Sequence, residues 1–383
     1  MEDHERIAYF YEHLFPIIKQ NHSVFGWPDV QPADVKPTYM KALTNMTYKV
    51  QCLTADVKNI LAKKFGTGFL DKLLNRPLDN KISEAFSKSG VGPNVLYYTN
   101  ETRFEEFLLS SEFTFEDMNN QRMRNLLTYY IVNMHHTEIP DLPAGTLVKR
   151  FLNGDLKLLQ LYEDALVEKA ALFDAKEKAI VDEVSKIVSK EELQWIEEQL
   201  ERVHAKQVVS HNDFLNGNIL KLSNDSLKLI DFEYCSYNFP MYDLANFINE
   251  SLVDYTPTME PYFSFNPDKR DSDEHVSKMV KYYMLFESYL PHKLTEAEAL
   301  KLVNNTELAE AELLKHHGGD ISKVASHLDD LMQQLRIGYL LSHLYWIAWC
   351  LLSAKTSKVK FGYFAFAAAR TEDYKRLKNK YFK

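Results

Sequence analysis

The sequence predicts an α+β chain with a small strand-rich part over residues 1–110 and a larger, mainly helical part over residues 111–383. In the first part, strand-like stretches occupy 41–53, 57–65 and 94–99. In the second part, long helical stretches occupy 115–135, 154–188 and 191–206. A strand–loop–strand pattern at 207–234 interrupts these helices, and further helical stretches follow to the C-terminus.

Composition limits the class of protein. The chain has 383 residues, of which 45% are hydrophobic and 13% aromatic, so it can bury a large core and differs from a disordered chain. Its formal net charge of −9 argues against a nucleic-acid-binding protein, which would carry a basic surface. We therefore expect a globular protein that acts without nucleic acid.

The cysteines and the N-terminus indicate a reducing compartment. Cys52, Cys235 and Cys350 are widely spaced and form no C-x-x-C pair, so neither a zinc site nor a disulfide framework is predicted. The first residues, MEDHERIAYF, lack the basic and apolar regions of a signal peptide. We expect a cytoplasmic protein.

One apolar segment approaches the length of a membrane span. Residues 337–354 (IGYLLSHLYWIAWCLLSA) contain no acidic residue, lysine or arginine. They do contain Ser342, His343 and Ser353, and the sequence has no second segment of this kind. We therefore predict a buried helix of the helical part, and no membrane span.

The strand-rich part begins with a helix and a hairpin. Residues 3–20 carry apolar positions at helical spacing, and Pro16 is expected to kink or end that helix. Residues 41–53 are predicted to form a β-hairpin with a polar tip at Thr44 and Asn45. The boundary with the helical part is placed near residue 110.

The stretch 207–234 (QVVSHNDFLNGNILKLSNDSLKLIDFEY) carries the polar residues of most interest. Residues 207–209 favour a strand, and 223–226 favour a tight turn, because their side chains can bond their own backbone. The polar side chains that this pattern places at strand ends and on neighbouring loops are Asp213, Asn218 and Asp231.

Two acids and an amide in this order suit phosphoryl transfer, which needs a positioned acceptor hydroxyl and a metal that neutralises phosphate charge. Asp213 can accept the proton of the hydroxyl. Asn218 and Asp231 supply the oxygen ligands that Mg²⁺ prefers, and Glu233 is close enough in sequence to assist a second ion. The spacing parallels the catalytic-loop and DFG motifs of protein kinases, with Glu233 in place of the glycine.

Each motif alone has a plainer interpretation. A lone His-Asn-Asp often caps a turn, and a lone Asp-Phe-Glu often ends a strand. Their order, with Asn218 and a hairpin between them, favours a phosphotransferase. His211 is expected to brace the loop through hydrogen bonds to the backbone rather than to take part in catalysis.

HNDFLNGNIL, followed by LIDFEYCSYNFPMYDLANFINE, resembles the choline kinases and the related ethanolamine kinases. Weaker similarity runs from about Tyr39 to the C-terminus. The resemblance implies a bilobal protein-kinase-like fold of the choline kinase/aminoglycoside phosphotransferase type. It also implies ATP and Mg²⁺ as cofactors, and a homodimer.

The resemblance places a phosphate-covering loop at Thr44 and Asn45. Lys41 and Ala42 stand where the family has glycines, and this weakens a backbone nest for phosphate. Hydroxyl, amide and Lys41 contacts are the expected substitutes.

Other nucleotide-binding positions follow from the resemblance. Lys63, with Lys64 as the alternative, matches the basic residue that reaches the nucleotide phosphates. Asp79 stands for the glutamate of the family's Arg-x-x-Glu motif, whose acid pairs with that base. Glu105 and Phe107 lie in the segment that matches the hinge, where backbone groups would hold adenine.

Choline carries a quaternary ammonium group, which proteins hold with aromatic faces. Trp346 and Trp349 project from one helix face, where the residues alone also allow a core stripe. The resemblance assigns both to the substrate pocket. The other substrate-binding residues that it implies are Asp213, Tyr234, Glu250, Tyr255 and Phe366. Asp243 is expected to brace the catalytic loop, and His135 to end a helix rather than to bind a metal.

The leading interpretation is an ATP-dependent kinase that phosphorylates the hydroxyl of choline to give phosphocholine for phosphatidylcholine synthesis. The first alternative is an ethanolamine kinase or an enzyme that accepts both small molecules. An aminoglycoside-type kinase shares only the core motif. A non-catalytic binding protein with a kinase fold stays open, because of the altered glycine loop and Asp79.

Overall fold

The computed structural model describes residues 3–40, 45–66, 75–152, 158–357 and 359–383. The chain divides into two compact units. Unit 1 comprises Met1–Ser111, Thr137–Asp141 and Leu220–Glu233, and unit 2 comprises Glu112–His136, Leu142–Ile219 and Tyr234–Lys383. The expected boundary at residue 110 lies next to the end of the first segment. It was not predicted that two segments after this boundary, Thr137–Asp141 and Leu220–Glu233, would also belong to unit 1.

Unit 1 is built on a five-stranded antiparallel sheet with the strand order β1-β2-β3-β5-β4. Its strands are β1 (Val35–Met40), β2 (Met46–Cys52), β3 (Ile60–Lys64), β4 (Val95–Tyr98) and β5 (Thr102–Glu106). The strand-like stretches predicted at 57–65 and 94–99 correspond to β3 and β4. The hairpin predicted at 41–53 is displaced, because only its second strand corresponds to β2 and the pairing strand β1 lies before residue 41. The register places Lys63 opposite Arg103 and Leu61 opposite Glu105.

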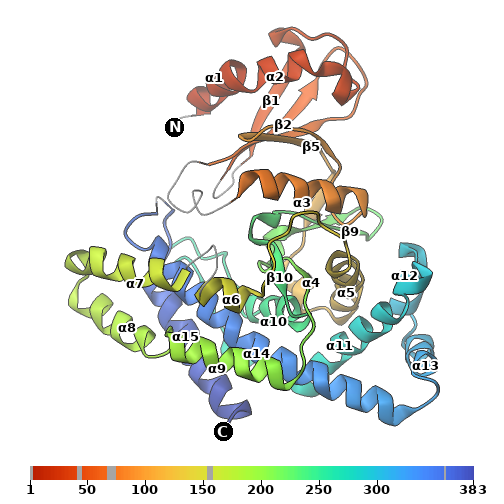
Figure 1. Cartoon of the computed structure of the whole chain (residues 1–383). Coiled ribbons are helices and arrows are strands. Elements are labelled where there is room, and N and C mark those ends of the chain that lie inside the picture. The colour runs from red at the N-terminus through yellow and green to blue at the C-terminus, as the bar shows by residue number, and fades with distance from the viewer. Residues whose placement is uncertain (1–2, 41–44, 67–74, 153–157, 358) are drawn as a thin grey trace. The chain divides into compact units, whose positions relative to one another are not determined.

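Two helices at the N-terminus pack on this sheet (Figure 1). α1 (Asp3–His13) ends before α2 (Phe15–Gln20), which has Pro16 in its first turn, so the predicted break at this proline is confirmed. The side chains of Phe10 and Leu14 are buried with Tyr48 of β2 in one apolar cluster. This burial ties the N-terminal segment to the sheet.

The rest of unit 1 carries the second acidic motif. α3 (Arg76–Lys88) starts where the side chain of Asn75 accepts a hydrogen bond from the backbone N–H of Leu78. A small sheet joins β6 (Ser110–Glu112), β8 (Ile219–Leu222) and β9 (Leu227–Leu229). The backbone N–H of Leu229 donates to the carbonyl of Val91 at 3.0 Å, which joins β9 to the segment after α3.

Unit 2 is mainly helical. Its helices are α4 (Phe115–Asn119), α5 (Gln121–His135), α6 (Leu147–Leu152), α7 (Leu158–Lys169), α8 (Ala175–Ser185), α9 (Lys190–Arg202), α10 (Met241–Glu250), α11 (Asp273–Ser288), α12 (Glu296–Val303), α13 (Thr306–His316), α14 (Ile321–Ser353) and α15 (Tyr363–Tyr381). Two short antiparallel pairs complete it, β7 (Val208–Ser210) with β10 (Ser236–Asn238) and β11 (Val253–Asp254) with β12 (Ser264–Phe265).

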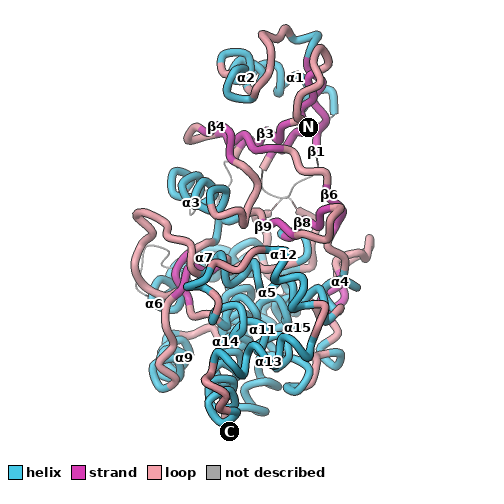
Figure 2. The backbone as a smooth tube through the Cα atoms, turned by 90° about the vertical axis from the view of Figure 1, so that its right-hand side faces the viewer, coloured by secondary structure: helices cyan, strands magenta, loops and turns pink. Residues whose placement is uncertain are grey.

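α14 is the central helix of unit 2 and packs against α10, α11 and α15. Figure 2 shows α14 among the helices of this unit. Among the described residues it is the helix long and apolar enough to cross a membrane, and 89% of its most apolar window is buried. That burial fits the predicted core helix. Between residues 337 and 354, every residue is buried except Trp346 and Trp349.

Candidate active site

The loop after β7 is held by one buried carboxylate of α10. Asp243 Oδ2 accepts a hydrogen bond from the backbone N–H of His211, and its Oδ1 accepts one from the backbone N–H of Asn212, each at 2.9 Å. On the other side, His135 Nε2 lies 3.0 Å from Asp243 Oδ2, and His135 Nδ1 lies 2.9 Å from the Tyr283 hydroxyl. The bracing role predicted for Asp243 is confirmed. His135 joins this network instead of only ending α5.

The backbone conformation and the hydrogen bonds of Asn212 explain why the motif has asparagine between the histidine and the aspartate. Its backbone is left-handed, with φ of 66°, a conformation that asparagine tolerates better than most residues. Its buried amide nitrogen donates to the carbonyl of Tyr234 and to the Ser236 hydroxyl, both at 2.9 Å. Its amide oxygen accepts from Asn238 at 2.9 Å. The asparagine therefore ties the loop to β10.

The carboxylate of Asp213 is half-buried and oriented by Asn218. The Asn218 amide nitrogen donates to Asp213 Oδ2 at 3.0 Å and to the Asp213 carbonyl at 2.8 Å. The Asp213 backbone N–H donates to His211 Nδ1 at 3.3 Å, which confirms the bracing role of His211. The Asn218 amide oxygen is the atom of that side chain left to act as a ligand.

The second acidic pair follows β9 in unit 1. Asp231 has a left-handed backbone with φ of 67°, and the side chain of Glu233 is 5% exposed. Burial and the charge of Asp231 raise the pKa of Glu233 to about 8, although Arg76 opposes the shift. A carboxylate whose charge is destabilised in this way, next to a second carboxylate, offers oxygen ligands that suit a hard divalent cation.

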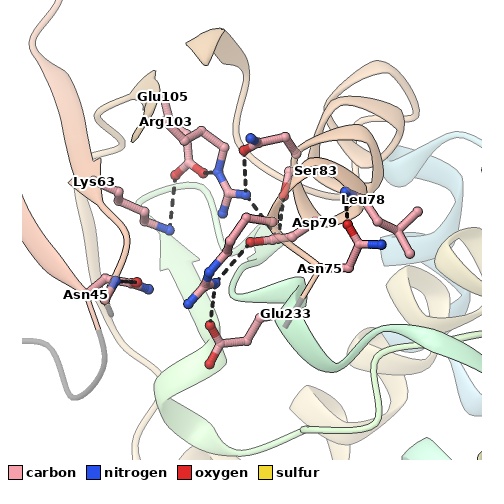
Figure 3. Close-up of polar contacts among 12 residues, drawn as sticks. Asn45, Lys63, Asn75, Leu78, Asp79, Ser83, Arg103, Glu105 and Glu233 are labelled. Carbon is pink, nitrogen blue, oxygen red and sulfur yellow. Dashed lines mark hydrogen bonds and ion pairs between the residues drawn. The ribbon is translucent and has the colours of Figure 1, made fainter. Parts of the chain in front are cut away.

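Lys63 is paired with Glu105 of β5 and not with Asp79 (Figure 3). Lys63 Nζ lies 3.4 Å from Glu105 Oε2, and Arg103 Nε donates to Glu105 Oε1 at 2.7 Å. Burial raises the pKa of Glu105, but the charges of Lys63 and Arg103 outweigh it and hold that pKa below its ordinary value. The expected Lys63–Asp79 pair is therefore wrong.

Asp79 is instead the partner of two arginines. Arg103 donates to Asp79 Oδ1 at 3.0 Å, and Arg76 lies 3.3 Å from Asp79 Oδ2 (Figure 3). Arg76 also donates to Glu233 Oε2 at 2.9 Å. A continuous set of ion pairs thus runs from Lys63 in the sheet to Glu233 after β9. We call the six residues the charged cluster: Lys63, Glu105, Arg103, Asp79, Arg76 and Glu233.

The hinge role predicted for the backbone at Glu105 and Phe107 stays a prediction, and the structure shows the other contacts of these residues. Glu105 lies inside β5, paired on both sides, and its side chain belongs to the charged cluster. The backbone N–H of Phe107 donates to the carbonyl of Asn59 at 3.1 Å, and Lys49 Nζ lies 4.6 Å from the centre of its ring. The backbone of both residues therefore forms hydrogen bonds with neighbouring segments of unit 1.

Only part of the predicted phosphate loop can be located. Asn45 is nearly buried, and its side-chain oxygen accepts a hydrogen bond from the backbone N–H of Gly66 at 3.3 Å. Thr44, Lys41 and Ala42 lie outside the described residues.

The predicted tryptophan pair is partly exposed and fixed at its polar edges. Trp346 Nε1 donates to Asn246 Oδ1 at 2.9 Å, and Trp349 Nε1 donates to the Tyr234 hydroxyl at 3.0 Å. The ring centroids of Trp346 lie 5.6 Å from those of Trp349 and 5.7 Å from those of Tyr234. Both indole N–H groups already donate hydrogen bonds. A ligand at this aromatic cluster (Tyr234, Trp346 and Trp349) would therefore contact the ring faces.

The remaining predicted substrate residues also lie together. The Tyr255 hydroxyl donates to Glu250 Oε2 at 2.7 Å, and the rings of Tyr255 and Phe366 are 6.3 Å apart. Arg370 of α15, which the sequence did not single out, forms an ion pair with Glu250. Its guanidinium carbon lies 4.7 Å from the centre of the Phe366 ring. The signal was present, since Arg370 follows Phe366 by one helical turn.

Comparison with known proteins agrees with these features over nearly the whole chain. Residues 38–375 match the choline/ethanolamine kinase family. A human choline/ethanolamine kinase is 23% identical over 367 residues, which cover 91% of this chain and 82% of the relative. Mouse choline kinase alpha is 26% identical over 317 residues, which cover 79% of this chain and 61% of the relative.

Solved structures show the same fold. A choline kinase from Cryptosporidium parvum superposes with a TM-score of 0.68 at 19% identity, covering 97% of this chain and 96% of the other. An ethanolamine kinase from Plasmodium vivax superposes with a TM-score of 0.64 at 17% identity, covering 97% and 94%. The predicted protein-kinase-like fold is thereby confirmed. On the match of residues 38–375, the chain belongs to the choline/ethanolamine kinase family.

Proposed function

We propose that this protein transfers a phosphoryl group from ATP to the hydroxyl of choline and releases phosphocholine. The observation that carries the choice of substrate is the exposure of Trp346 and Trp349 in a helix segment that is otherwise buried. A core stripe would bury both rings. Partly exposed indole faces with satisfied N–H edges suit a ligand that carries positive charge and no hydrogen-bond donor on that charge.

Asp213 is the proposed base. In this role its carboxylate orients the choline hydroxyl and accepts its proton as the oxygen attacks phosphorus. The hydrogen bond from Asn218 to Oδ2 fixes the orientation of the carboxylate that would meet the hydroxyl. The hydrogen bonds that Asp243 accepts from the backbone of the loop would hold that position during the reaction.

Lys63 is the proposed cation for the nucleotide phosphates, because Glu105 holds its ammonium group at the end of β3. Among the described residues, no three histidine, cysteine or acidic side chains form a metal site by themselves. In unit 1, Asp231 and Glu233 would hold a Mg²⁺ ion together with phosphate and water oxygens. The amide oxygen of Asn218, in unit 2, is the other ligand that the sequence proposes. The ion would supply neutralisation of phosphate charge.

Choline is favoured over ethanolamine because acceptors for a primary ammonium are already used. A desolvated cation–π contact contributes about 2 kcal/mol, and each buried methyl group adds about 0.8 kcal/mol. A primary ammonium loses hydration unless its N–H donors find acceptors. Both oxygens of Glu250 have partners, and the Tyr234 hydroxyl accepts from Trp349. Ethanolamine, or both substrates, remains the alternative, since relatives carry both names.

The test compares both substrates with Mg-ATP. We expect kcat/KM for choline to exceed that for ethanolamine by about tenfold or more, since a tenfold difference needs only about 1.4 kcal/mol. Trp346→Ala or Trp349→Ala should raise the choline KM more than the ethanolamine KM. Trp195→Ala, a change far along the chain in α9, is the control. Higher kcat/KM for ethanolamine, or an unchanged choline KM in both cluster variants, would contradict the proposal.

A further inference from the structure

We propose that the cation neutralised by Glu250 is Arg370 and not the substrate, and that Arg370 thereby determines the preference for a quaternary over a primary ammonium. The inference rests on the proposed function and deepens it. It differs from the substrate-binding role that the family resemblance implies for Glu250.

Arg370 depends on Glu250 for its charge balance. Its side chain is 1% exposed, and a guanidinium this deeply buried requires a carboxylate partner. The other nearby acid, Asp373, accepts hydrogen bonds from Arg270 and Arg376, each at 2.6 Å. In the part of the chain that the structure describes, Glu250 is the carboxylate paired with Arg370.

Glu250 is correspondingly withdrawn from a ligand. Its side chain is 6% exposed, one oxygen contacts Arg370, and the other accepts from the Tyr255 hydroxyl at 2.7 Å. Tyr255 itself is 41% exposed. A ligand at this position therefore meets the tyrosine ring, with a neutral ion pair behind it. Such a surface attracts a quaternary ammonium through aromatic faces, whereas a primary ammonium meets a carboxylate that is already paired with Arg370 and Tyr255.

Removing the charge of Arg370 should reverse this balance. Arg370→Met keeps much of the aliphatic length but releases one Glu250 oxygen with its full negative charge. A primary ammonium can donate a charge-assisted hydrogen bond to that oxygen, whereas the methyl groups of choline block a close approach. We expect the ratio of kcat/KM for choline to that for ethanolamine to fall about tenfold. Arg370→Lys keeps the charge and should retain most of the ratio.

A double-mutant cycle decides which cation Glu250 serves. The four proteins are wild type, Glu250→Gln, Arg370→Met and the variant with both changes, each measured with choline and ethanolamine. Glu250→Gln alone leaves an unpaired buried cation that repels both substrates, so the choline KM should rise about tenfold. The double variant has no unpaired charge, and its choline KM should return to within about threefold of wild type.

A double variant that stays impaired would contradict the inference. If Glu250 binds the substrate cation directly, the double variant will be at least as impaired as Glu250→Gln, and the inference is wrong. Arg376→Met is the matched control, because it removes an arginine of α15 that pairs with Asp373 and not with Glu250. Its substrate ratio should equal that of wild type. If Arg370→Met does not fold, the comparison of Glu250→Gln with the double variant still decides.

Binding measurements separate this inference from the proposed function. Tryptophan fluorescence reports choline and ethanolamine binding at the aromatic cluster without turnover. If wild type phosphorylates neither substrate, the proposed function fails, while the same titrations across the cycle still test Arg370. If wild type prefers choline but the ratio does not move in Arg370→Met, the inference fails and the proposed function stands.

Discussion

The position of the Asp213 carboxylate is fixed by residues whose roles could be predicted from the sequence and by others whose roles could not. The spacing of Asp213 and Asn218 predicted their roles, and the structure joins them through the amide of Asn218. The network of His135 and Asp243 could be predicted only in part, because a contact between helices leaves no local pattern. Arg370 was missed although it follows Phe366 by one helical turn, because its pairing with Glu250 is likewise a contact between helices.

The first prediction at this scale concerns the proposed base. Asp213→Asn keeps the shape of the side chain but removes the charge that accepts a proton. We expect kcat to fall roughly 10²–10⁴-fold with little change in nucleotide affinity. Asp225→Asn, in the exposed turn between β8 and β9, is the matched control and should retain wild-type kcat. Near-normal turnover in a folded Asp213→Asn protein would remove Asp213 from the mechanism.

At the scale of elements, strand register decides the partners of the charged cluster. The sequence predicted the strands, but the Lys63–Asp79 pairing failed because β5 inserts Arg103 between the two side chains. A period-two signal was available, since Arg103 and Glu105 must point to one face of a strand. Which strand lies beside β3 could not be predicted, because β4 and β5 exchange their sequence order in the sheet.

This arrangement predicts a large stability difference between neighbouring cations. Arg103→Met leaves Glu105 and Asp79 buried without their shared partner, and we expect it to lower the free energy of unfolding by about 3–5 kcal/mol. Lys64→Met removes the partner of exposed Glu101 and should cost less than about 1 kcal/mol. Urea denaturation of both variants makes the comparison. Similar midpoints for the two would show that Arg103 contributes no more than a surface pair.

At the scale of the whole molecule, the sequence predicted the change from strands to helices near residue 110 but not the composition of each unit. Leu220–Glu233 lies more than a hundred residues after the N-terminal strands and yet belongs to unit 1. The hydrogen bond from Leu229 to Val91 shows why, since it joins residues more than a hundred positions apart. Only tertiary packing determines such a contact.

Stability should also depend on pH through a buried histidine of the helical core. Burial, with the charges of Arg370 and Arg270, lowers the pKa of His343 to about 4, although Asp373 opposes the shift. In the unfolded chain a histidine has a pKa of about 6.5, so between these values the unfolded state binds more protons. Stability is then fully present above about pH 6.5 and is lost as the pH falls toward 4.

The expected loss is roughly 3 kcal/mol, from 1.36 kcal/mol for each pKa unit. The difference between wild type and His343→Gln isolates it, because other acidic and histidine groups titrate in both proteins. The slope of unfolding free energy against pH between 4.5 and 6.5 should be shallower in His343→Gln. Equal slopes would show that His343 is not held neutral in the fold.

The pairing of Lys63 with Glu105 has a consequence for control of this enzyme. Both residues belong to neighbouring strands of one sheet, so the lysine is set in place as soon as the sheet forms. In a protein where the paired acid lies on a helix, an outward movement of that helix would break the ion pair that positions the lysine. Here the lysine and its acid belong to one sheet, so we expect a displacement of α3 to leave the Lys63–Glu105 pair intact.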